Sequence, residues 1–145
     1  MSMYFIGIDI SKYKHDCCII SAANQKVVSK VIIKNNKAGF NELLTIIHSL
    51  ANPADIRIGF ESTAHYALNL ELFLENSLLT FMEVNPVLIS EYKKSKTLRR
   101  TKTDSVDCES IARWLMTVEY KPHSKGFYHA YSLKSLTRLR DKLIR

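Results

Sequence analysis

The chain is poor in the two residues that most often shape loops, with four glycines and three prolines among 145 residues. The glycines stand far apart, at Gly7, Gly39, Gly59 and Gly126. ATPases of the actin-like and sugar-kinase-like classes hold nucleotide phosphates in glycine-rich loops, where backbone N–H groups approach the phosphate closely. With no clustered glycines, the sequence argues against an ATPase of this kind.

Cysteine and long apolar runs are also scarce. Cys17 and Cys18 are adjacent and point to opposite faces if they lie on a strand, and with Cys108 they form no CxxC spacing, so a zinc site is not expected. No apolar run approaches the ~20 residues of a membrane helix, and the N-terminus lacks the features of a signal peptide. Free thiols are typical of a reducing compartment, and we expect a cytoplasmic location with no membrane partner.

Negative charge is scarce in the last third of the chain. Residues 1–90 hold seven Lys and Arg against eight Asp and Glu, whereas residues 91–145 hold fourteen against six. Six cations and no acid lie between positions 93 and 102, namely Lys93, Lys94, Lys96, Arg99, Arg100 and Lys102. Clustered positive charge favours a nucleic-acid partner, with a solvated basic face as the alternative. We expect these six residues, together with Lys12, to contact nucleic acid.

The order of apolar patterns predicts an α/β fold. Strands are expected at residues 3–10, 15–21, 26–34, 56–61 and 79–84. Helices are expected over 40–50 with Asn35 or Asn36 as cap, after Ser62 or Thr63, after Asn85-Pro86, and from Thr103 or Asp104 to about Thr117. The segment from Lys93 to Lys102 reads as a linker or mobile loop. Three antiparallel strands followed by alternating helices and strands predict a ribonuclease H-like (RuvC-like) mixed sheet flanked by helices.

Four carboxylates stand where such a fold would gather them: Asp9, Glu61, Asp104 and Asp107. Asp9 and Glu61 end apolar runs, and the other two begin a predicted helix. Each has an ordinary alternative, which is a turn for Asp9, a helix cap for Glu61 and Asp104, and a surface acid for Asp107. Asp107 is expected on the core-facing side of the helix with Ile111, where capping would not explain it.

Carboxylates that converge in this way suit a hard divalent cation, because Mg²⁺ prefers oxygen ligands and keeps several waters. Two such ions, ~4 Å apart, can hold both the attacking and the leaving oxygen of a phosphodiester displacement. The sequence therefore predicts a catalytic site for Mg²⁺ or Mn²⁺ at Asp9, Glu61, Asp104 and Asp107.

Four stretches carry a resemblance to a known family. They are Gly7-Ile8-Asp9-Ile10-Ser11-Lys12, Phe60-Glu61-Ser62-Thr63, Asn85-Pro86 and Lys102-Thr103-Asp104-Ser105-Val106-Asp107. They resemble the N-terminal domain of the insertion sequence 110 family of transposases, which is related to the Piv-type DNA invertases. The resemblance covers about residues 3–120 and maps the family's DEDD tetrad onto the four carboxylates. Ala64 and Cys108 replace a glycine and an alanine usual in the family, without removing a carboxylate.

The resemblance implies a prokaryotic, nucleoid-associated DNA recombinase that moves an insertion element, in some members with a guide-like structured RNA. It implies a RuvC-like catalytic domain over residues 1–120 and a linker over 121–145 that begins a basic coiled-coil segment, through which the protein would form a homo-oligomer. A C-terminal domain with a serine nucleophile is expected beyond this fragment. The alternatives are a stand-alone Holliday-junction resolvase-like nuclease and a non-catalytic nucleic-acid-binding module.

Overall fold

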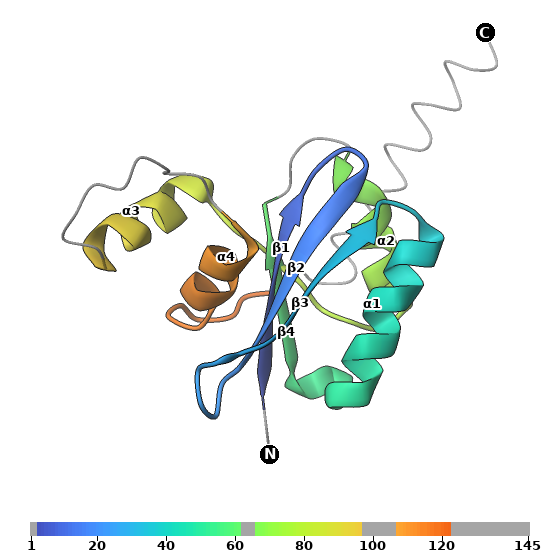
Figure 1. Ribbon diagram of the computed structural model, residues 1–145, viewed down its shortest axis with the longest axis horizontal. Helices are drawn as coiled ribbons and strands as arrows, with labels where there is room; N and C mark the ends of the chain where they lie inside the picture. The colour runs from blue at the N-terminus through green and yellow to red at the C-terminus, as the bar shows by residue number, and fades with distance from the viewer. Residues whose placement is uncertain (1–2, 62–65, 97–106, 123–145) are drawn as a thin grey trace, which may run out of the picture.

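The computed structural model describes residues 3–61, 66–96 and 107–122 (Figure 1). Several predicted features lie outside these ranges: Ser62, Thr63, Arg99, Arg100, Lys102, Thr103, Asp104, and the basic helical segment from Ser132 to Arg145. In the part of the chain that is described, no helix has the length and apolar character to cross a membrane.

A five-stranded mixed sheet forms the centre of the molecule, with the order β3-β2-β1-β4-β5. Its strands are β1 (Tyr4–Ile10), β2 (Lys14–Ser21), β3 (Val27–Lys34), β4 (Ile56–Phe60) and β5 (Met82–Glu83). The first three strands form an antiparallel meander, and β4 and β5 join it in parallel pairing. The predicted α/β, ribonuclease H-like mixed sheet is confirmed, and the first strand is its central member.

Helices cover both faces of the sheet. They are α1 (Lys37–Leu50), α2 (Leu68–Asn76), α3 (Pro86–Lys96) and α4 (Cys108–Leu115), with a short 3₁₀ helix, η1 (Pro53–Asp55). Figure 1 shows α1 and α2 on one side of the sheet and α4 with α3 on the other. Asn36 caps α1 as predicted, since its side chain accepts a hydrogen bond from the Gly39 N–H at 2.9 Å.

The two faces of the sheet bury different side chains because strand residues alternate. Ile6, Ile8 and Cys17 lie in the larger core beneath α1 and α2, whereas Cys18 packs with Cys108 beneath α4. Cys17 and Cys18 thus point to opposite faces, as expected, and all three cysteines are free and buried.

Gly7 lets α4 lie directly on β1. A Cβ atom at this position would come within 2.2 Å of the Cys108 carbonyl oxygen and 2.4 Å of the Ala112 nitrogen, both in the backbone of α4. A side chain here would therefore force the helix away from the sheet. This close approach fixes where the N-terminus of α4 sits relative to the end of β1.

Three predicted element boundaries are wrong. Helix α3 runs through Lys93 and Lys94 to Lys96, so the first part of the supposed linker is helical. The last helix begins at Cys108 and not at Thr103 or Asp104, and α2 begins at Leu68 with Ala67 as an N-cap that makes no side-chain bond.

The fifth strand is much shorter than the predicted range of 79–84. The Tyr120 hydroxyl accepts a hydrogen bond from the Ile58 N–H at 3.4 Å and bonds with the Thr80 hydroxyl at 2.8 Å. The tyrosine therefore takes the position along β4 that a longer fifth strand would occupy.

Candidate functional site

Asp9 and Glu61 come together because β1 and β4 are parallel neighbours. Their register ends with Ile8 opposite Phe60, so the two acids follow directly at the same edge of the sheet. Asp9 shares the face of Gly7, which is the face that α4 covers. The strands that lead into Asp9 and Glu61 are therefore neighbours in the sheet.

Asp107 reaches this edge from α4, but in a different role from the one expected. It is the N-cap of the helix, with its Oδ1 accepting from the Ser110 N–H at 2.7 Å and its own N–H donating to the Ser110 hydroxyl at 3.0 Å. The side chain is exposed. The prediction that Asp107 lies on the core-facing side with Ile111, where capping would not account for it, is wrong.

A further acid, Asp16, was not among the predicted site residues. It lies directly opposite Asp9 in the antiparallel register of β1 and β2. Its Oδ1 is buried and has no hydrogen-bond partner among the described residues. Asp16 could have been predicted by pairing the first two strands as an antiparallel hairpin. That register places Asp16 opposite Asp9 and on the same face of the sheet as Cys18.

The acids act on one another electrostatically. The pKa of Asp9 is raised from its ordinary value, first because burial penalises the charged carboxylate, and then because Asp16, Asp107 and Glu61 repel a further negative charge. Asp16 is the largest of these three contributions. A nearby cation would reduce the repulsion among these carboxylates and would give the unbonded Asp16 Oδ1 an electrostatic partner.

The acids at this edge fit the divalent metal that the sequence predicts in donor type but not in number. Within residues 3–61, 66–96 and 107–122, no three His, Cys, Asp or Glu side chains are grouped closely enough to hold a metal ion. Asp104, the fourth predicted ligand, lies outside these ranges. The donor type nevertheless fits, because hard carboxylate oxygens lie near one edge of the sheet and the buried Asp16 Oδ1 lacks a partner among the described residues. The residues are therefore compatible with Mg²⁺ or Mn²⁺.

The predicted nucleic-acid residues are divided between two places. Lys12 lies in the turn between β1 and β2, with its Nζ 5.2 Å from the centre of the Tyr13 ring. Lys93, Lys94 and Lys96 follow one another along the end of α3, which packs on α4 through Ile89. Arg99, Arg100 and Lys102 lie outside the described residues.

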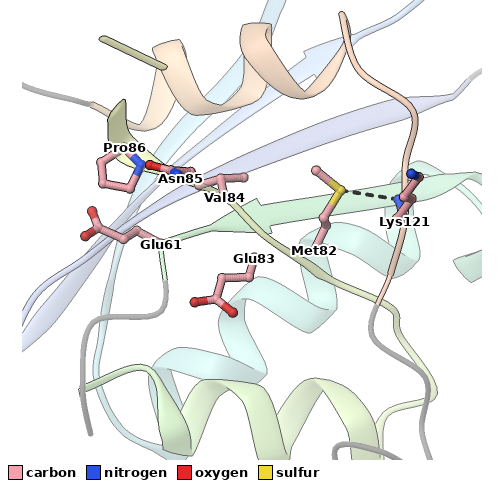
Figure 2. Close-up of a pocket in the computed structure, with 7 residues that line it drawn as sticks. All are labelled: Glu61, Met82, Glu83, Val84, Asn85, Pro86 and Lys121. Carbon is pink, nitrogen blue, oxygen red and sulfur yellow. Dashed lines mark hydrogen bonds between the residues drawn. The ribbon is translucent and has the colours of Figure 1, made fainter. Parts of the chain in front are cut away.

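A cavity of about 470 Å³ opens beside Glu61. It is lined by Glu61, Met82, Glu83, Val84, Asn85, Pro86 and Lys121. Figure 2 shows Glu61 near Pro86 at one end and Lys121 beside Met82 at the other, where the Lys121 N–H donates to the Met82 sulfur at 3.3 Å. Glu61 thus borders both the acidic edge and this cavity.

Comparisons with known proteins agree on one family. The family model for DEDD transposases of insertion sequence 110 type, described as transposase, matches residues 6–145. Pilin gene-inverting proteins of Moraxella bovis and Moraxella lacunata are each 33% identical over 115 residues, which is 79% of this chain and 34% of each relative. The chain thus spans about a third of the length of these relatives.

A solved structure shares the fold. T. thermophilus RuvC, in complex with a Holliday junction substrate, superposes with a TM-score of 0.54 at 10% identity, over 83% of this chain and 99% of that one. At this identity the likeness supports the RuvC-like architecture and says nothing further about chemistry.

Proposed function

Because the chain belongs to the DEDD transposase family of insertion sequence 110 type, we propose that it forms a metal-dependent catalytic domain acting on DNA phosphodiesters during transposition of an insertion element. One observation supports this proposal: Asp9 on β1, Glu61 after β4 and Asp107 before α4 lie near one edge of a RuvC-like sheet, where their charges interact. We assign Asp104 to the same set from the family pattern.

The proposed roles follow from the position of each acid. Asp9, on the central strand, would hold the metal together with Glu61 from the end of β4 and Asp107 from the start of α4. Mg²⁺ or Mn²⁺ held there would stabilise charge on the attacking and leaving oxygens of the scissile phosphate.

Asp107 can serve the helix and a metal at once. Its Oδ1 caps α4, while no described residue hydrogen-bonds to its second oxygen. The Ser110 N–H orients the carboxylate by donating to Oδ1, and the Ser110 hydroxyl holds the Asp107 backbone by bonding with its N–H and its carbonyl. Because the Asp107 carboxylate is already oriented, it would lose less conformational freedom on binding a metal.

Metal binding provides the direct test. Calorimetric titration with Mn²⁺ should show binding to the wild-type protein and a loss of at least tenfold in affinity for Asp9→Asn and Glu61→Gln. Glu42→Gln is a matched control, because Glu42 is an exposed acid on α1, on the other face of the sheet. Equal Mn²⁺ affinity in all four proteins, with circular dichroism showing an intact fold, would refute the assigned ligands.

DNA cleavage tests the chemical part of the proposal. Incubation with Mg²⁺ and either a four-way junction or a linear duplex should give metal-dependent nicking that Asp9→Asn abolishes. A strong preference for the junction would favour the alternative of a resolvase-like nuclease. Nucleic-acid binding without any cleavage in the full-length protein would favour a non-catalytic module.

The remaining features inferred from the family stay predictions. They are a domain boundary near residue 120, a C-terminal domain with a serine nucleophile, a guide-like RNA and a homo-oligomer formed through the basic C-terminal segment. Since the chain spans about a third of its curated relatives, we propose that complete recombination requires the longer protein.

A further inference from the structure

Two lysines face each other at the end of the sheet that carries the acids. Lys14 begins β2 and is paired with Lys34, the last residue of β3, and both side chains are exposed. We propose that Lys14 and Lys34 form a phosphate-binding surface that guides a DNA strand to the acidic edge. This inference rests on the proposed function, because it names where the DNA backbone of that reaction lies.

The charges of this pair are not neutralised within the protein. Among the described residues, neither lysine forms an ion pair, and like charges directly opposite each other in a sheet are destabilising. Lys30, four residues before Lys34 on the same face of β3, instead contacts Glu109 at 2.8 Å. Lys30 is therefore neutralised by Glu109, whereas Lys14 and Lys34 are available to an external anion.

Their position relative to the acids follows from the register. Lys14 and Asp16 lie two residues apart on the same face of β2, which corresponds to about 7 Å along the strand. Asp16 is itself opposite Asp9 on one side and Ile32 on the other. Ile32 is 62% exposed, so α4 leaves this corner of the face open. A phosphate held by the two lysines would put the adjoining backbone beside the acids.

The backbone around the lysines is held in place. In the turn that precedes β2, the Ser11 hydroxyl donates to the Lys14 carbonyl and the Asn35 side-chain amide donates to the Lys12 carbonyl at 3.0 Å. The Asn35 N–H donates to the Tyr13 carbonyl at 2.9 Å, which ties the residue after Lys34 to the same turn. Binding a phosphate here therefore requires ordering of the lysine side chains but little ordering of backbone.

Salt dependence of DNA binding tests the proposal. The probe is a labelled DNA duplex of arbitrary sequence in EDTA, with anisotropy read over a series of salt concentrations. Replacing both lysines, as Lys14→Gln with Lys34→Gln, should lower the log–log salt slope by about 1.8, or ~0.9 for each lost phosphate contact. The control is Lys26→Gln, an exposed lysine just before β3 at the end of that strand away from Lys34, and its slope should not change.

Three results would overturn the proposal. The first is an unchanged salt slope in the Lys14 and Lys34 double variant, and the second is an equal fall of the slope in the control. The third is that the wild-type protein does not bind the DNA duplex. A slope that fell for an RNA duplex but not for DNA would overturn the assignment to DNA. EDTA removes any contribution from divalent metal, so failure here leaves the Mn²⁺ titration of the acids standing as a separate result.

Discussion

Replacing Gly7 with alanine should displace α4 and with it the acid that α4 carries. The new Cβ would lie 2.2 Å from the Cys108 carbonyl oxygen, and ordinary contact begins at 3.4 Å, so the helix must move by about 1.2 Å. Overpacking of this kind costs about 1–3 kcal/mol. A shift of ~1 Å in a reacting geometry can cost 10²-fold in rate. We therefore expect lower stability together with weaker Mn²⁺ binding, and in consequence a large loss of metal-dependent activity.

Urea unfolding and Mn²⁺ calorimetry would measure the two effects on the same protein. Gly59→Ala is the control, because its Cβ would meet only side-chain carbons of Leu115 and Val84, at 3.2 and 3.3 Å. These side chains can adjust, so the control should lose less stability and retain its affinity for Mn²⁺. If Gly7→Ala unfolds within ~0.5 kcal/mol of wild type and binds Mn²⁺ equally well, the close approach of α4 does not position the site.

Two further predictions separate the roles of the neighbouring acids. Asp107→Ala should lower the free energy of unfolding in urea by about 1 kcal/mol, because the N-cap is lost. Asp107→Asn should keep that stability, because asparagine also caps helices, and should still weaken Mn²⁺ binding. Equal Mn²⁺ affinity in Asp107→Asn and wild type would contradict the ligand role. Because the folded pKa of Asp9 is raised above 3.8, the metal-free protein should lose stability as pH rises from that value through the folded pKa. Asp16→Asn removes one repelling charge, so urea unfolding followed from acidic to neutral pH should show a weaker dependence, and an unchanged profile would contradict it.

Much of the fold could be predicted because the sequence changes its period clearly. The apolar run before Asp9 and the Val- and Ile-rich stretch after Lys26 indicate strands, and the spacing from Phe40 to Leu50 indicates a helix, which the structure has over Lys37–Leu50. The boundaries of α3 and α4 were missed for local reasons. Lysines are compatible with both a helix and a loop, and an acid before Cys108 can be either a cap or a first-turn residue.

The acidic site was predictable only in part. Asp9 and Glu61 were found because each ends an apolar strand and parallel neighbours end at one edge. Asp16 was missed because its role depends on a cross-strand register, which single-strand patterns do not specify. The same limit hid the pairing of Lys14 with Lys34, since they are twenty positions apart in the sequence.

The central position of β1 has a consequence for the order in which the chain gains function during synthesis. A nascent chain can pair β1 with β2 as soon as the first hairpin has emerged, but the other edge of β1 must wait for β4, and the cap of α4 comes only with Asp107. Long-range pairing of this kind is slow compared with hairpin closure. A partly synthesised chain therefore carries a hairpin with Asp9 and Asp16 but no assembled set of acids, so any attack on DNA must await the complete domain.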